Sequence, residues 1–145
     1  SIGTDSLAEE CVLPKPTKAD AEMFLKIWDM FRDEDLKKAM WWLQEEPAVK
    51  SYEEFKKKYP MGSEGYRNFM TVGMVFEMVG VLVYYGVLNE DLVFDFFGLM
   101  WNKAEPIVKG MQKEMGRTLF ENYEWLAKKR AEWSKKRPPK FPEEK

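Results

Sequence analysis

The chain has 145 residues, a net charge of −2 and a pI of about 5.4. It contains no histidine and one cysteine, which excludes Ser-His-Asp and Cys-His catalytic sites, structural zinc sites and an internal disulfide. The mild net charge is not that of a nucleic-acid-binding protein, so we expect no nucleic-acid partner. We also predict no cofactor, and any catalysis would have to use carboxylates, lysine or tyrosine.

Residues 1–17 show no sustained periodicity, which predicts an irregular N-terminal segment. Thr17, with Asp20 three residues later, resembles a helix N-cap, and apolar residues recur at helical spacing beyond it. Asp33 is predicted to cap a second helix that ends at Pro47. One continuous helix through this region is the alternative.

Trp41 and Trp42 are consecutive in the second helix, so their side chains point about 100° apart. With Leu43 on the inward side, Trp42 is expected off the apolar stripe and Trp41 near its far edge. At least one indole should therefore be exposed or should bury itself against a second molecule. We predict an interface here with a protein partner or in a homodimer. The alternative is that Val12 and Leu13 of the N-terminal segment cover the indole.

A short helix, opened by Ser51 and Glu54, precedes the most apolar part of the chain. Between Asn68 and Asn89 the only charged residue is Glu77. Such a run is long enough for a transmembrane helix, but it also fits the central helix of a bundle, covered on every face. A charge in mid-run and amphipathic neighbours favour the bundle. We therefore predict no membrane insertion and retain a membrane-associated helix as the alternative.

Gly73, Glu77 and Gly80 share one face of this central helix, because they are four and three residues apart. The glycines would let another backbone approach closely, and the carboxylate between them would be shielded from water. We interpret this face as a close helix crossing in which Glu77 pairs with an arginine or caps a neighbouring backbone N–H. A functional carboxylate with a raised pKa is the alternative.

Local signals mark the later helices. Gly86 is predicted to end the central helix in a left-handed conformation, and Asn89 to cap the next helix. Pro106 is predicted to kink a later helix that ends at Gly116. Thr118 and Glu121 are predicted to form a capping box for the last helix. Asp91 and Asp95, four residues apart, could supply half of a magnesium site, but no further oxygen ligands are evident, so we predict no metal.

These elements define an all-α fold: a compact multi-helix bundle around a central hydrophobic helix at about residues 66–85. We assign residues 18–134 to a single helical domain and residues 135–145 to a basic, proline-rich tail. Lys136, Pro139 and Pro142 have the spacing of a polyproline ligand, although a solvated tail is the simpler interpretation.

Residues 75–98, VFEMVGVLVYYGVLNEDLVFDFFG, resemble the central signature of domain of unknown function 4760 (DUF4760), an uncharacterised helical family. Three later features also resemble the family, in its second pair of helices. They are Trp101, Pro106-Ile107 and the segment ENYEWL at residues 121–126. The resemblance spans about residues 21–127 and departs at Met78, where a second acidic residue would follow Glu77. It implies an all-α fold and no established activity.

Two functional hypotheses follow from these features. The first is a non-catalytic protein-interaction or scaffold domain, and the second is a binder of an apolar small molecule between helices. A contiguous exposed apolar patch would favour the first, and an enclosed apolar pocket the second. The single cysteine and the lack of a secretory signal in this chain predict a cytoplasmic protein.

Overall fold

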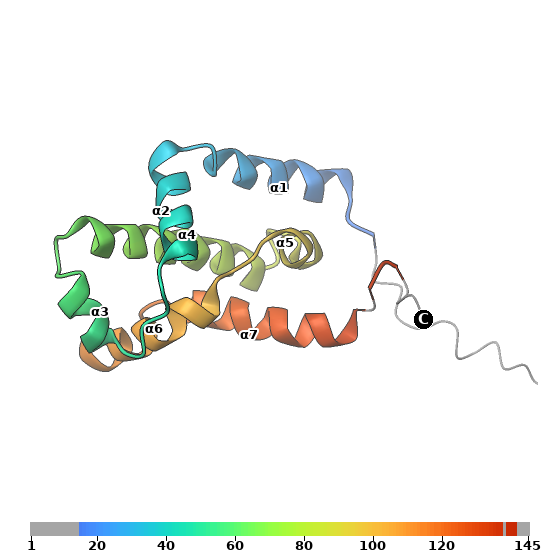
Figure 1. Cartoon of the computed structure of the whole chain (residues 1–145). Coiled ribbons are helices and arrows are strands. Elements are labelled where there is room, and N and C mark those ends of the chain that lie inside the picture. The colour runs from blue at the N-terminus through green and yellow to red at the C-terminus, as the bar shows by residue number, and fades with distance from the viewer. Residues whose placement is uncertain (1–14, 138, 142–145) are drawn as a thin grey trace, which may run out of the picture.

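The structure is a computed structural model, and it describes residues 15–137 and 139–141 (Figure 1). Within these residues there are seven helices and no strand. The helices are α1 (Lys18–Met30), α2 (Glu34–Glu45), α3 (Tyr52–Lys58), α4 (Glu64–Tyr84), α5 (Glu90–Phe96), α6 (Trp101–Met115) and α7 (Glu121–Lys136). The prediction of an all-α bundle is confirmed.

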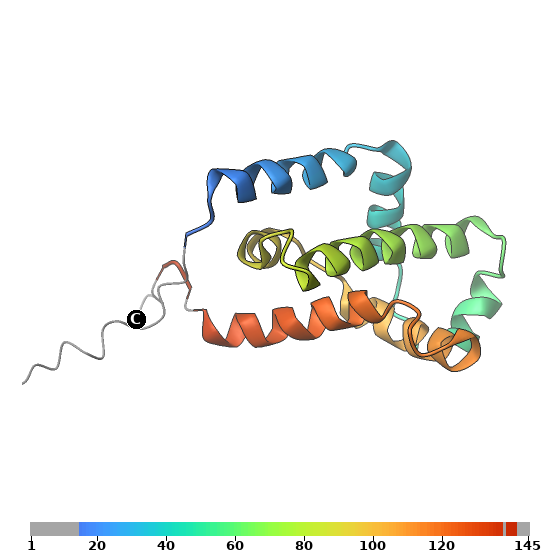
Figure 2. The ribbon, with the colours of Figure 1, turned by 180° about the vertical axis from the view of Figure 1, so that it is seen from behind.

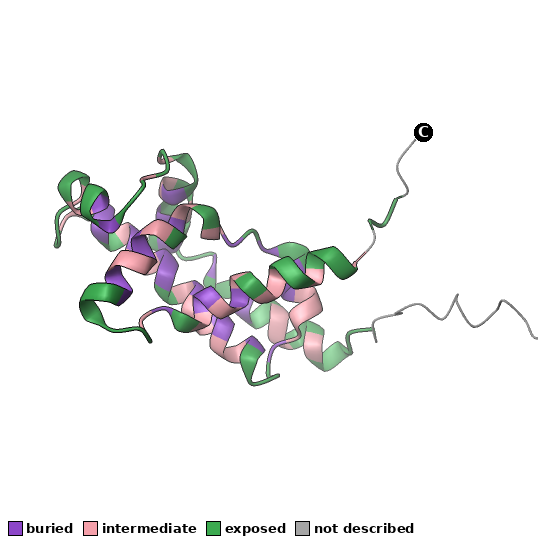
Figure 3. Ribbon diagram, turned by 90° about the horizontal axis from the view of Figure 1, so that it is seen from below, coloured by how far each residue is buried: buried purple, intermediate pink, exposed green. Residues whose placement is uncertain are grey.

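Helix α4 is the element around which the others pack, as predicted, and it begins two residues earlier than the sequence suggested. Its most extensive contacts are with α7 and α2. The view from behind shows α4 between α1 and α7, with α5 beside it (Figure 2). Phe69, Val72, Phe76 and Val79 are fully buried along α4, where they form the centre of the core. Each of the described helices has at least one buried residue, and these positions are purple in Figure 3.

By length and composition, α4 is the one helix in the described part of the chain that is apolar enough to cross a membrane. In the structure, 44% of its most apolar window is buried against the rest of the chain. The buried side chains of α4 face α2 and α7, whereas Met74 and Tyr84 are exposed.

The predicted local signals begin and end most of the helices. Side-chain oxygens of Thr17, Asp33, Ser51 and Asn89 each accept a backbone N–H three residues on, at 2.9–3.1 Å. The first two helices are therefore separate, because Asp33 starts α2 after a turn. At Ser51 the capping box is only half formed, since Glu54 accepts the N–H of Lys50 instead.

Gly86 ends α4 with a φ of +73°, as predicted. The N–H of Gly86 donates to the Val83 carbonyl, and the N–H of Val87 donates to the Leu82 carbonyl, both at 3.0 Å. This pair of bonds is a Schellman motif, which satisfies the last carbonyls of the helix. It also turns the chain back so that α5 can pack on α1.

Helix α6 continues through Pro106 and ends at Gly116, where φ is +120°. It packs against α3, where Gly110 allows a close approach of Tyr52. Helix α7 then runs to Lys136 and so includes the first two residues of the segment assigned to the tail. Together α6 and α7 complete the lower side of the molecule in Figure 1.

Candidate functional site

The Glu77 carboxylate binds the first turn of α7. One of its oxygens accepts the backbone N–H of Asn122 at 3.2 Å and the Asn122 side-chain amide at 2.7 Å. The other oxygen accepts the backbone N–H of Tyr123 at 3.0 Å. These are the N–H groups of the second and third helical positions, which have no partner within a helix. Glu77 therefore caps α7 from another helix.

The capping box predicted at Thr118 and Glu121 is wrong. The residue at the N-cap position is Phe120, which has a φ of +54° and provides no side-chain cap. The chain reaches α7 through a turn at residues 117–120, so Thr118 precedes the N-cap position by two residues. The sequence signal failed because the helix begins two residues after the position that the box would cap, and a carboxylate from α4 accepts the N–H groups of that first turn.

Gly73 and Gly80 allow this contact by giving α7 direct access to the backbone of α4. A Cβ at Gly73 would lie 2.8 Å from the ring of Phe120. A Cβ at Gly80 would lie 2.4 Å from the carbonyl oxygen of Asn122. The three residues of the predicted face thus hold the start of α7: two by leaving space, and Glu77 by accepting hydrogen bonds.

This geometry leaves little scope for chemistry at Glu77. Both of its oxygens already accept hydrogen bonds from fixed donors, two of which are backbone groups. A carboxylate at a helix N-terminus also interacts favourably with the helix dipole. The arrangement is that of a structural cap, and it lacks the unengaged oxygen that a general base needs.

A second carboxylate, Glu124, is more deeply buried, and the sequence analysis did not single it out. Its side chain is 4% exposed and contacts cations from three parts of the chain. They are Lys109, Arg117 and Lys128. Only Lys128, four residues along α7, had a signal in the sequence. The cluster joins α6, the following turn and α7, which is consistent with a structural role.

The pKa of Glu124 reflects these contacts. Burial alone would raise the pKa of its carboxyl group, but hydrogen bonds outweigh that effect and lower the pKa to about 2. The donors are Lys109, Lys128, Gln112 and Arg117. Because each oxygen of Glu124 is engaged by these groups, it too has no oxygen available to a substrate.

Asp91 and Asp95 do not converge on a metal site. Asp91 accepts the indole N–H of Trp133 at 2.8 Å, and Asp95 pairs with Arg137 and with Lys140. The Arg137 and Lys140 contacts hold the pKa of Asp95 below its usual value. No group of three metal-ligating side chains occurs in the described ranges. Pro142, the last residue of the polyproline-like spacing, lies outside these ranges.

The adjacent tryptophans of α2 have different environments. The Trp42 ring is half-buried and meets the ring of Tyr59 edge-on, with centroids 5.1 Å apart. Trp41 is 61% exposed. The apolar pattern of α2 placed Trp42 further from the core than Trp41, but Trp42 is the better covered of the two. The reason is Tyr59, which follows α3 and which the pattern of α2 alone does not show as a partner.

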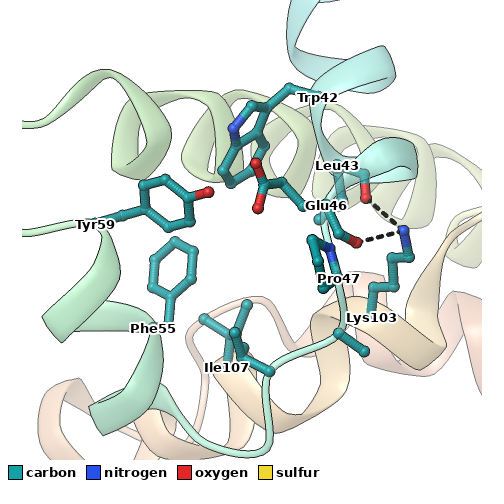
Figure 4. Close-up of a pocket in the computed structure, with 10 residues that line it drawn as sticks. Trp42, Leu43, Glu46, Pro47, Phe55, Tyr59, Lys103 and Ile107 are labelled. Atoms are coloured by element: carbon teal, nitrogen blue, oxygen red, sulfur yellow. Dashed lines mark hydrogen bonds between the residues drawn. The ribbon is translucent and has the colours of Figure 1, made fainter.

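Trp42 and Tyr59 border a small pocket between α2, α3 and α6 (Figure 4). Lys103 closes one side of it by donating hydrogen bonds to the carbonyls of Leu43 at 3.0 Å and Glu46 at 2.7 Å. The cavity measures about 10 Å³. That is about the room that one water molecule needs, so the cavity is too small for an organic ligand.

Trp41 instead faces an open apolar groove between α1, α2 and the segment that follows α5. Phe31 and Phe97 are buried at its base, with ring centroids 4.9 Å apart. Trp28 and Phe96 stand beside them and are 42% and 55% exposed, respectively. Lys37, Arg32 and Gln44 also line the groove, and none of the described acidic residues does. We refer to it as the aromatic groove.

The sequence does not show what covers the aromatic groove. Val12 and Leu13, the residues that were considered as a cover for the indole, lie outside the described residues. Within the part of the chain that the structure describes, Trp41, Trp28 and Phe96 are all exposed around this groove. A cluster of large exposed aromatic side chains of this kind is typical of a contact surface.

The structure thus defines an all-α domain in which a parallel pair of helices, α4 and α7, is joined by a carboxylate cap. The family model described as "Domain of unknown function (DUF4760)" matches residues 16–133. The chain therefore belongs to this family, as its resemblance implied. No curated protein and no solved structure shows significant similarity to it.

Proposed function

We propose that this chain is a non-catalytic interaction domain whose aromatic groove binds a segment of a partner protein. The observation that supports this proposal is the joint exposure of Trp28, Trp41 and Phe96 around one groove. Aromatic side chains give large contact areas at low entropic cost and are enriched at protein interfaces. Covering them would remove three large aromatic rings from water.

The lining of the groove indicates the chemistry of the partner. Its charged residues are Arg32 and Lys37, although the chain as a whole carries a net charge of −2. Each of these cations forms an exposed ion pair with an acidic residue three positions before it, Asp29 for Arg32 and Glu34 for Lys37. Such exposed pairs are weak and can exchange partners. We therefore propose a segment that combines large apolar side chains with carboxylates.

The alternative function, binding of an apolar small molecule inside the bundle, has less support. The small cavity beside Trp42 holds about 10 Å³. The aromatic groove is open to solvent along its length, and a small apolar ligand in it would stay partly exposed. Typical small-molecule sites bury most of the surface of their ligand.

The test uses an array of short synthetic peptides in which apolar, acidic and basic content is varied independently. We expect the full chain to bind peptides that combine Leu, Phe or Trp with Asp or Glu. Trp41→Ala should weaken that binding by about tenfold, the effect of losing one aromatic anchor. Tyr85→Ala is the matched control: it removes an exposed aromatic ring at the far end of α4 and should leave binding unchanged.

Three results would overturn the proposal. Equal binding of basic and acidic peptides would contradict the inferred charge preference. Unchanged peptide binding by Trp41→Ala would place the contact elsewhere. Sedimentation that shows a wild-type dimer, converted to a monomer by Trp41→Ala, would identify a second copy of the chain as the occupant of the groove.

A further inference from the structure

The C-terminal end of α4 and the first turns of α7 form a second aromatic site, which shares no residue with the aromatic groove. Tyr84, Tyr85 and Trp125 line one hollow together with Val81, Glu121 and Asn122. Tyr84 and Tyr85 are 57% and 74% exposed, although they follow a run of buried residues on α4. Large rings left this open at the end of a core helix have no role in the packing of the core.

The ring of Tyr84 stands at nearly a right angle to each of two aromatic neighbours. Its centroid lies 5.2 Å from that of Tyr85, with an interplanar angle of 81°. It also lies 5.2 Å from that of Trp125, with an angle of 77°. Each of these two pairs of rings forms a corner, and all three rings line the same hollow. A compact ligand in the hollow can therefore touch more than one ring at once.

The position of Trp125 follows from the close contact between the two helices. Gly80 brings the backbone of Asn122 directly against α4. The next turn of each helix then brings Trp125 to Tyr84, since the two helices run in the same direction (Figure 1). The flanking residues Tyr123 and Leu126 are buried in the core, which fixes the helix that carries the indole.

The charge around this hollow favours a cation. Glu121 lines it and is exposed, and no described Lys or Arg forms an ion pair with it. Tyr84 and Tyr85 are at the C-terminal end of α4, which carries the negative end of its helix dipole. The positive end of α7 is nearby, but the Glu77 carboxylate is bound to it.

We propose that Tyr84, Tyr85, Trp125 and Glu121 bind a methylated ammonium group. Ring faces attract cations, and a trimethylammonium group fits a corner of rings because it is round and has no N–H donors to satisfy. A bare lysine ammonium is strongly hydrated, and the ring faces that line this hollow cannot replace the water that it would lose. The carboxylate of Glu121 adds a long-range attraction without requiring a hydrogen bond.

Choline and its neutral tert-butyl isostere provide the test, because they have the same shape and differ in charge. In an NMR titration of isotope-labelled full-length chain, choline should shift the Trp125 indole and the Tyr85 backbone signals with saturation. The isostere should bind about tenfold more weakly, the expected contribution of the cation–π attraction. N-trimethyl-lysine and phosphocholine then distinguish a methylated protein side chain from a lipid headgroup as the natural source.

Variants locate the site and separate it from the aromatic groove. Tyr85→Ala changes a largely exposed ring and should weaken choline binding about tenfold with no loss of fold. Glu121→Gln should weaken it less and make it independent of salt. Trp41→Ala is the control and should bind choline as the wild type does. Equal affinity for choline and the isostere, or choline shifts that survive Tyr85→Ala, would overturn the proposal.

Discussion

The carboxylate of Glu77 and the backbone N–H of Tyr123 form a 3.0 Å hydrogen bond across 46 residues of the chain. This bond joins the middle of the most apolar helix to the first turn of the last one. It places a charge where the core would otherwise exclude it, and it satisfies N–H groups that the local sequence leaves unpaired. Both aromatic sites proposed above lie on helices whose positions depend on α4.

Replacement of Glu77 by Gln should destabilise the chain. The amide keeps one acceptor oxygen but loses the charge that interacts with the N-terminus of α7, and its NH₂ group faces N–H donors. We expect a loss of about 1–3 kcal/mol in the free energy of unfolding, measured by urea titration. Thr118→Ala is the control and should change it by less than about 0.5 kcal/mol. Equal effects of the two variants would show that the local capping box operates after all.

The glycines on either side of Glu77 should tolerate alanine poorly. At Gly80 the added Cβ meets a backbone carbonyl at 2.4 Å, so α7 has to move; at Gly73 it meets the ring of Phe120 at 2.8 Å. The gain in helix propensity, about 1 kcal/mol, opposes this strain. We expect Gly80→Ala to cost at least about 2 kcal/mol and Gly73→Ala less, because a ring can shift more easily than a backbone.

Gly98→Ala is the matched control for these two variants, since a Cβ there meets nothing within 4 Å. Urea titration of the three proteins measures the difference. A Gly80→Ala variant as stable as the wild type would contradict the close contact between α4 and Asn122.

Interactions within one or two turns could be predicted from the sequence. The caps at Thr17, Asp33 and Asn89 and the helix end at Gly86 depend on residues at most four positions away, and each is formed. The shared face of Gly73, Glu77 and Gly80 was also evident, because helix geometry alone determines it. What the sequence did not contain was the identity of the element that this face binds.

Contacts between distant segments account for what was missed. Thr118 carries a valid local cap signal, but Glu77 competes for the same helix end and prevails. Glu124 was overlooked because two of its three cations, Lys109 and Arg117, come from other segments. In the same way, Tyr59 decides which of the two adjacent tryptophans is covered.

Acid should weaken the fold through Glu124. The carboxyl group has a pKa of about 2 in the folded chain, below its usual 4.5. A lowered pKa stabilises the folded state fully above pH 4.5, and this contribution is lost as the pH falls from about 4.5 to about 2. The difference corresponds to at most about 3 kcal/mol, and less where solvent screens the exposed cations.

Unfolding measured across this pH range tests the role of Glu124. Glu124→Gln should be less stable than the wild type at neutral pH and should lose less stability between pH 4.5 and 2. Glu114→Gln, which removes an exposed pair with Lys56, is the control and should follow the wild-type profile to within about 0.5 kcal/mol. Parallel curves for wild type and Glu124→Gln would contradict the assignment.

The burial of α4 predicts that this chain is soluble without detergent. Its apolar residues pack on α2 and α7, and 44% of its most apolar window is buried. A detergent-free preparation should show a strongly helical far-UV circular dichroism spectrum and a cooperative thermal transition. A requirement for detergent, or partition into phosphatidylcholine vesicles with gain of helicity, would instead support the membrane-associated alternative.

The two tryptophans of α2 should respond differently to alanine. Trp42→Ala removes a half-buried ring that contacts Tyr59 and borders the small cavity, so it should cost about 2–3 kcal/mol in the free energy of unfolding. Trp41→Ala removes a ring that is 61% exposed and should cost less than about 0.5 kcal/mol. Because the two positions are adjacent on one helix, any effect on helix propensity is the same for both. Urea titration of both variants measures the difference, and a stability loss for Trp41→Ala as large as that for Trp42→Ala would mean that another part of the chain covers the aromatic groove.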